Sequence, residues 1–117
     1  MAQAIKDIAK EGSCVIVGRA ADYVLKDHED LFRVFIYAPK EYRVKRIMEV
    51  YGDSYDAAKK HVRHSDEARA SYYKKISGLE WGDRENYDLI VNSSIGLEES
   101  AELICSHIRI IERDANR

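Results

Sequence analysis

Apolar residues occur along the chain in two patterns, nearly continuous runs and stripes at helical spacing. The runs cover residues 13–17, 31–38 and 89–91. A short, mainly apolar run that ends at turn residues is typical of a strand buried on both faces, as in a parallel sheet. We therefore predict three strands, the first of which ends at Gly18 and Arg19.

Helical spacing of apolar residues marks the segments between and around these strands. The predicted helices cover residues 2–10, 20–26, 39–51, 54–76 and 97–111. Pro39 suits the first position of a helix, because its missing N–H costs nothing there, and Gly52 suits a helix end. The short oxygen-bearing side chain of Asp53 or Ser54 is a suitable cap for the next helix.

The order of elements is helix, strand, helix, strand, helix, helix, strand, helix. Such alternation predicts an α/β fold, a three-layer sandwich with a parallel sheet and right-handed crossovers. The chain has 117 residues and one proline, and it contains no internal repeat. We therefore expect a single domain over residues 1–117, large enough to bury about two thirds of its unfolded surface.

The composition of the chain argues against nucleic acid and membranes as binding partners. The 19 basic and 21 acidic residues are mixed along the chain, so no basic stripe points to nucleic acid. Cys14 and Cys105 lie inside a predicted strand and a predicted helix, and we expect both to be buried and reduced. No signal-peptide pattern and no apolar run of about 18 residues is present, which predicts a soluble, cytoplasmic protein without a membrane partner.

Arg19 lies at a position where parallel sheets commonly bind ligands, just beyond the carboxyl end of a strand. Gly18 allows the backbone to turn, and the guanidinium group of Arg19 offers a planar charged fork to a phosphate or carboxylate. The same two residues are equally compatible with an ordinary turn followed by a surface arginine.

One face of the predicted helix over 54–76 carries both apolar and charged residues when projected at about 100° per residue. The members of this face are Tyr55, Ala58, Val62, Asp66, Arg69, Tyr73 and Ile76. An unpaired buried charge is costly, so Asp66 and Arg69 must either neutralise each other or face a polar cavity. A half-covered surface ion pair is the alternative.

Arg43 and Arg46 lie one turn apart on the predicted helix that follows the second strand. By themselves, they would be ordinary solvated side chains. Together with Arg19 and Arg69, they would bring several guanidinium groups to one end of the sheet. Such a cluster can bind phosphoryl groups.

Other chemistries have weaker support in the sequence. His61 and His64 are three residues apart, but no HExxH-type motif accompanies them, so we expect no metal site. Four aromatic residues are able to stack on a base, although aromatic residues more often pack in a core: Trp81, Tyr72, Tyr73 and Tyr87.

Four segments, taken in order, form a recognisable pattern. They are CVIVGRAADYVL from Cys14, FIYAPKEYRVKR from Phe35, DEARASYYK from Asp66, and WGD from Trp81 followed by NYDLIVNS from Asn86. Together they resemble the cytidylate kinase-like family of P-loop nucleoside monophosphate kinases. The resemblance implies a P-loop kinase fold and phosphoryl transfer from ATP, with Mg²⁺, to a CMP-like nucleoside monophosphate.

The resemblance also implies roles for the substrate-binding residues. Gly18 and Arg19 would meet the monophosphate of the substrate. Family members usually have Asp directly after this Arg, whereas this chain has Ala20, so Asp22 is a candidate substitute and the pyrimidine preference stays open.

For the later segments, the resemblance implies that Asp66 and Arg69 hold the acceptor nucleotide. Arg43 and Arg46 would belong to the start of a mobile lid and would reach the transferred phosphoryl group in a catalytic role.

The largest departure from the family concerns the donor site, because the 117 residues contain no G-x-x-x-x-G-K-[ST] motif. In such kinases this loop cradles the donor phosphates and contributes to Mg²⁺ binding. We therefore expect a carboxyl-terminal portion that lacks the central P-loop strand, binds ATP and Mg²⁺ poorly and is inactive alone. Its open strand edges would favour a homo-oligomer that completes the sheet.

Two alternatives remain at this point. One is a P-loop-less relative that binds nucleotides or a partner without catalysis. The other is a small α/β interaction module in which the arginines are surface residues.

Overall fold

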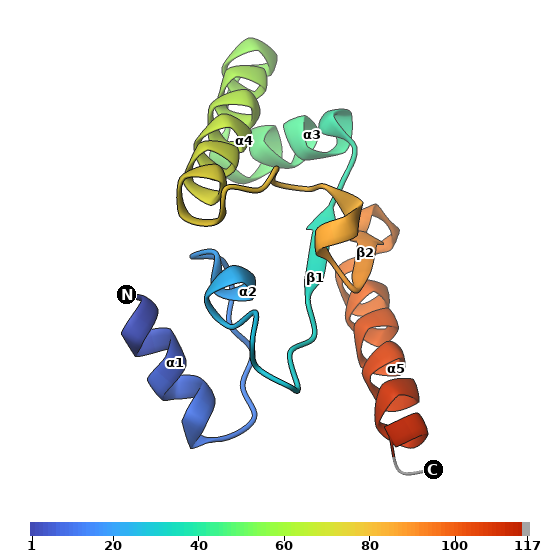
Figure 1. The fold of residues 1–117 in the computed structure, drawn as a ribbon. Coiled ribbons are helices and arrows are strands. Elements are labelled where there is room, and N and C mark those ends of the chain that lie inside the picture. The colour runs from blue at the N-terminus through green and yellow to red at the C-terminus, as the bar shows by residue number, and fades with distance from the viewer. Residues whose placement is uncertain (116–117) are drawn as a thin grey trace.

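The computed structural model describes residues 1–115 and contains five helices and two strands over that range (Figure 1). They are α1 (Ala2–Glu11), α2 (Ala21–Val24), β1 (Val34–Tyr37), α3 (Lys40–Tyr51), α4 (Tyr55–Ser77), β2 (Leu89–Asn92) and α5 (Leu97–Ala115), with short 3-10 helices at Arg84–Asn86 and Ser93–Ile95. All five predicted helices and the second and third predicted strands are confirmed.

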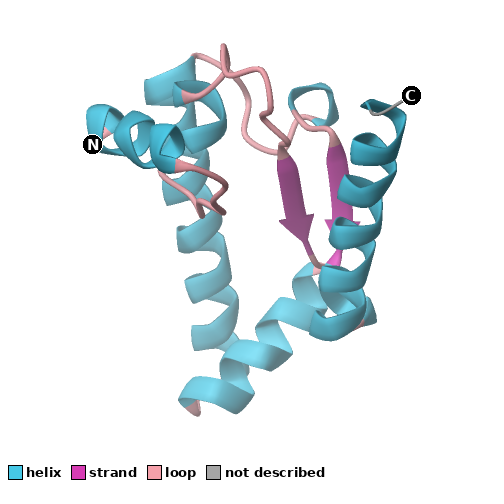
Figure 2. Ribbon diagram, turned by 90° about the horizontal axis from the view of Figure 1, so that it is seen from below, coloured by secondary structure: helices cyan, strands magenta, loops and turns pink. Residues whose placement is uncertain are grey.

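The two strands form a parallel sheet, as the sequence predicts. Val34 of β1 pairs with Leu89 of β2, and the register runs on to Tyr37 opposite Asn92. Figures 1 and 2 show α1 and α2 on one side of the sheet and α5 on the other. The structure is therefore a mixed α/β fold, while the larger P-loop kinase-like sandwich stays a prediction.

The predicted first strand is wrong, because residues 13–17 are not assigned to a strand. Val15 and Val17 are 92% and 87% exposed. A strand needs a neighbour to pair with its N–H and C=O groups, and the sheet of the described residues has only two strands. Cys14 is consequently exposed instead of buried. The expected burial of Cys105 is also wrong, since it lies on the exposed side of α5.

Helices α3 and α4 form a packed pair joined by a short turn (Figure 1). Gly52 ends α3 in the left-handed conformation with φ of 72°, which glycine adopts without steric cost. The Oγ of Ser54 accepts a hydrogen bond from the N–H of Ala57 at 3.2 Å and so caps α4. Val44, Ala58 and Val62 form the buried core between the two helices.

Helix α5 covers the sheet less completely than its apolar stripe predicts. Ile104 and Ile108 are half-buried, whereas Leu97 is 65% exposed and Ile111 is 45% exposed. A groove of about 530 Å³ lies between β2 and α5. Within residues 1–115, no helix has both the length and the apolar character to span a membrane.

The described part of the chain is more extended than a well-packed domain. Its radius of gyration is 16.2 Å, and its extents are 51 × 31 × 25 Å. A compact domain of this length has a radius of gyration of about 13 Å. Apolar faces of the sheet and of α5 therefore remain open to solvent.

Candidate functional site

Arg43 and Asp66 join the end of the sheet to the middle of α4. The Nη1 of Arg43 donates hydrogen bonds to Oδ1 and Oδ2 of Asp66 at 2.7 and 2.9 Å. The Nε of Arg43 donates to the carbonyl oxygen of Ala38 at 2.9 Å. Ala38 is buried and directly follows β1. The guanidinium group thus ties this end of β1 to α4.

The ion pair shows how the charge of Asp66 on α4 is neutralised. The side chains of Arg43 and Asp66 are 30% and 24% exposed, so the pair is partly shielded from water. Charge-assisted hydrogen bonds of this kind are roughly twice as strong as those between neutral groups. The partner of Asp66 is Arg43 and not Arg69, so the two charges of α4 do not neutralise each other.

Arg69 and Arg46 are both exposed. Arg69 lies on α4 between Asp66 and Tyr73, three residues after the first and four before the second. Residues at these spacings share one face of a helix. Among residues 1–115, neither Arg69 nor Arg46 forms a salt bridge within 4.0 Å. Their guanidinium groups are therefore available to an anionic ligand.

Tyr73 and Asp22 join α4 to α2. Tyr73 is only 6% exposed, and its hydroxyl group donates a hydrogen bond to Oδ2 of Asp22 at 2.7 Å. Burial raises the pKa of Tyr73 well above its ordinary value, and the hydrogen bond to Asp22 and its negative charge raise the pKa further. The hydroxyl group consequently remains a donor at neutral pH. This contact was not predicted from the sequence, since 51 positions separate the two residues.

The turn before α2 has an unusual backbone. Gly18, Arg19 and Ala20 have φ angles of 74°, 58° and 52°. A left-handed conformation is ordinary for glycine but strained for residues with a Cβ atom. Arg19 is exposed in this turn, whereas Ala20 and Ala21 are buried. The turn therefore presents the guanidinium-bearing residue to solvent and packs the small residues inward.

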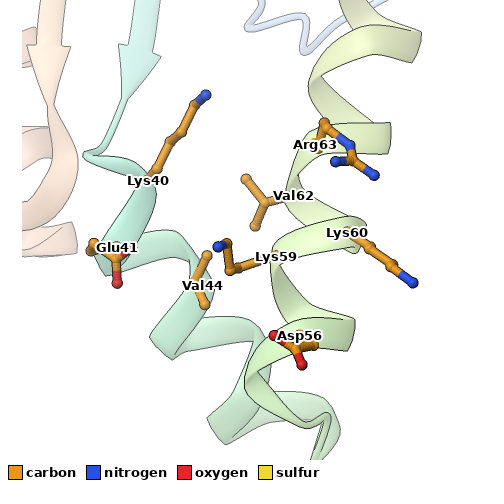
Figure 3. A pocket seen from close by; sticks show the side chains of 8 residues that line it. All are labelled: Lys40, Glu41, Val44, Asp56, Lys59, Lys60, Val62 and Arg63. Atoms are coloured by element: carbon orange, nitrogen blue, oxygen red, sulfur yellow. The ribbon is translucent and has the colours of Figure 1, made fainter.

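A cavity of about 400 Å³ lies between α3 and α4. Its lining residues are Lys40, Glu41, Val44, Asp56, Lys59, Lys60, Val62 and Arg63 (Figure 3). Lys60 points away from α3, while Lys59 lies between the two helices. Sequence reasoning missed Arg63, although it repeats the spacing of Asp66 and Arg69, three residues apart on one helix.

Two of the residues considered for base stacking, Trp81 and Tyr87, pack against Phe35 of β1. The ring of Phe35 lies 5.3 Å from that of Trp81 at 78° and 4.9 Å from that of Tyr87 at 39°. The hydroxyl oxygen of Tyr87 accepts a hydrogen bond from the N–H of Gly82 at 3.3 Å. Offset or edge-to-face rings at such separations are typical of a core cluster.

His61 also has local partners. The Nδ1 of His61 lies 3.9 Å from Oδ2 of Asp53, and its ring lies 5.8 Å from that of Tyr51. In the described range 1–115, no group of three or more His, Cys, Asp or Glu side chains is placed to hold a metal ion. The charged face of α4 therefore remains the candidate functional site.

The fold and site define the class as a mixed α/β protein with a parallel sheet, in which polar or charged side chains of α2 and α3 bond to residues of α4. The model of the cytidylate kinase-like family matches residues 1–95. The chain belongs to this family.

Individual relatives agree with the family assignment. The chain is 34% identical to the cytidylate kinase of Methanococcoides burtonii over 89 residues, covering 75% of this chain and 49% of the relative. It is 31% identical to that of Ignicoccus hospitalis over 97 residues, covering 82% and 56%. The chain thus spans about half the length of the curated relatives it matches.

A solved structure resembles the whole fold. The crystal structure of an uncharacterized protein from Eubacterium ventriosum superposes with a TM-score of 0.87 at 27% identity. The match covers 92% of this chain and 62% of that one. The arrangement of helices and strands described above therefore recurs in an experimentally determined protein.

Proposed function

We propose that these residues form the acceptor-nucleotide and lid segments of a nucleoside monophosphate kinase, with a CMP-like nucleotide as the ligand. The observation that carries the proposal is the Arg43–Asp66 pair, which holds the end of β1 against the face of α4 that also carries Arg69. Membership in the cytidylate kinase-like family supplies the substrate class. The cytidylate kinase relatives support it.

The substrate phosphate would be held by arginines. Arg69 and Arg19 are exposed, and each guanidinium group offers the paired donors that match phosphate oxygens. Gly18 makes the turn that presents Arg19. Asp66, held by Arg43, would accept a hydrogen bond from the nucleoside. Asp22 would support the site through its bond to Tyr73.

Arg43 and Arg46 would serve the transferred phosphoryl group. A guanidinium group has five N–H donors, and the bonds of Arg43 to Ala38 and Asp66 use its Nε and Nη1. Its Nη2 remains available for a phosphoryl oxygen. Arg46, one turn further along α3, would add a second positive charge. Phosphoryl transfer depends mainly on such positioned charges.

Donor binding requires elements that these 117 residues do not contain. The sequence has no G-x-x-x-x-G-K-[ST] motif, whose N–H groups and Lys would bind the ATP phosphates. ATP and Mg²⁺ would therefore serve a complete kinase of this family, and we propose that the 117 residues alone bind neither tightly and transfer no phosphate. The same observation favours the second candidate, a nucleotide-binding or interaction module without catalysis.

The exposed surface supports two further proposals, self-association of the chain and a cytoplasmic location. The apolar side chains of Ile36 and Ile90 are 56% and 37% exposed on the two strands. Open, apolar strands favour pairing with another copy of the chain, so we propose self-association. Cys14 and Cys105 are exposed free thiols, which suits a reducing cytoplasm.

Thermal unfolding with CMP, UMP, dCMP and ATP tests the nucleotide site. Ligand at about ten times its Kd stabilises a protein by about 1.4 kcal/mol, which raises the Tm of a small domain by roughly 5 °C. We expect CMP to cause this rise and ATP to cause none. Arg69→Ala should abolish the rise, whereas the control Arg109→Ala, on an exposed position of α5, should retain it. No response to any monophosphate would contradict the proposed site.

A further inference from the structure

The turn at residues 18–20 is strained and yet lies at the proposed phosphate site. Arg19 and Ala20 adopt the left-handed conformation immediately after Gly18, which does so as well. Non-glycine residues remain in such conformations only where the surrounding structure holds them. Something outside the turn must therefore stabilise it.

Helix α2 is a weak support for the turn by itself. It has four residues, Ala21–Val24, and an isolated helix of that length does not persist in water. Its backbone bonds are local, and they run from Ala21 N–H to the Gly18 oxygen at 3.2 Å and from Val24 N–H to the Ala20 oxygen at 3.0 Å. These bonds shape the turn without attaching it to the rest of the molecule.

Helix α2 packs against α1, where Ala20 and Ala21 are buried. The attachment of the turn to α4 is made by the side chain of Asp22. Its carboxylate accepts the hydrogen bond from Tyr73, which lies on α4 and is only 6% exposed. Tyr73 lies one helical turn beyond Arg69 on the same face. The bond therefore joins the turn that carries Arg19 to the part of α4 that carries Arg69.

We propose that Tyr73 is a positioning residue that holds the 18–20 turn through Asp22, so that Arg19 and Arg69 bind the phosphate of one nucleoside monophosphate together. This inference rests on the proposed function for its ligand, but the attachment of the turn to α4 can be tested without any ligand. Tyr73 itself does not touch the phosphate.

The hydroxyl group of Tyr73 stays protonated and can therefore act as the hydrogen-bond donor. Burial and the neighbouring Asp22 carboxylate both raise its pKa, and the charged or polar groups that face it are Asp22 from α2 and Tyr87 from the segment before β2. An ionised tyrosine next to a carboxylate would be repelled. The hydroxyl group therefore stays protonated and able to donate to Asp22 at neutral pH.

Amide hydrogen exchange of the unliganded chain tests the attachment. In Tyr73→Phe, we expect the amides of residues 21–24 to exchange about tenfold faster, because α2 loses its anchor. Tyr72→Phe is the matched control, since Tyr72 is the adjacent residue on α4 and is 40% exposed. Asp22→Ala should behave like Tyr73→Phe, whereas Asp22→Asn keeps an acceptor oxygen and should largely retain protection. Unchanged exchange in Tyr73→Phe would overturn the inference.

CMP binding by calorimetry then tests the positioning of Arg19. We expect Tyr73→Phe to raise the Kd for CMP about tenfold in the otherwise unchanged chain, but to have no further effect in an Arg19→Ala background. If Tyr73 has a merely structural role, Tyr73→Phe should raise the Kd for CMP by the same factor in both backgrounds. That result would overturn the positioning role. If the unchanged chain binds no CMP, the proposed function fails, and the joint binding of phosphate by the two arginines fails with it. The exchange rates would still decide whether Tyr73 anchors the turn.

Discussion

The α3–α4 pair and the segment at residues 13–17 both carry apolar residues, but these residues lie in different environments. Ala58 is fully buried and Val44 is 3% exposed between the two helices, whereas Val15 is 92% exposed. A helix satisfies its backbone hydrogen bonds internally and needs only one apolar partner surface. A strand requires neighbours along its edges as well. The comparison teaches that strand formation here depends on partners that the sequence pattern does not reveal.

The candidate site also combines a well-packed part with a less well-supported part. On α4, Asp66 is held by two hydrogen bonds from Arg43, within a packed pair of helices. On the amino-terminal side, the strained turn that carries Arg19 is joined to α4 by the hydrogen bond between Asp22 and Tyr73. The two halves of the proposed phosphate site therefore differ in how firmly they are supported.

Placing a charge in the helix pair should give the largest effect. Ala58→Asp would bury an unpaired carboxylate at a position with no exposed surface, and we expect a loss of roughly 3 kcal/mol or more in the free energy of unfolding. Urea unfolding followed by circular dichroism measures this. Ala57→Asp, at the adjacent exposed position, is the control and should cost much less. Equal losses would contradict the packing of the helix pair.

Removing the ion pair should give an intermediate effect. Asp66→Ala leaves the partly buried Arg43 with its bond to Ala38 alone, and we expect a cost of about 1–3 kcal/mol. The neighbouring exposed residue provides the control Glu67→Ala, which should stay within about 0.5 kcal/mol of the unchanged protein. If the two variants unfold at the same urea concentration, Arg43 and Asp66 do not hold α3 and α4 together.

Alkaline pH should loosen the attachment of α2. The pKa of Tyr73 is raised in the folded state, so its contribution to stability is complete below the unfolded pKa of about 10. That contribution is lost as the pH rises above 10 towards the folded pKa. Between pH 8 and pH 11, Tyr73→Phe should therefore lose less stability than the unchanged chain. Identical pH dependence of the two unfolding free energies would contradict this prediction, and Tyr72→Phe serves as the control.

The smallest effect is expected in the unpaired segment. Val15→Asp changes a residue that is 92% exposed, so the free energy of unfolding of the monomer should change by no more than about 0.5 kcal/mol. A large destabilisation would show that residues 13–17 pack against something in solution. Light scattering of the same samples would show whether the chain self-associates and whether the charge reduces that association.

Much of the helical structure was predictable from the sequence because its signals are local. Gly52 ends α3 as expected and Ser54 caps α4, while Pro39 lies at the N-cap, one residue before the first position of α3. The helical projection correctly placed Asp66 on a face shared with the buried residues Val62 and Tyr73. The roles assigned to Gly18, Arg19, Asp22, Asp66, Arg69, Arg43 and Arg46 in catalysis or substrate binding remain predictions.

By itself, the sequence determined the order and approximate positions of the helices and of the two parallel strands, together with the family pattern, because capping, periodicity and motif order depend on neighbouring residues. Only the tertiary structure decided that Asp66 pairs with Arg43 and that Asp22 pairs with Tyr73. These pairs lie 23 and 51 positions apart, and the sequence offers several other residues with suitable charge or hydrogen-bonding groups to each. The choice depends on how β1, α2 and α4 pack, which no local pattern in the chain specifies.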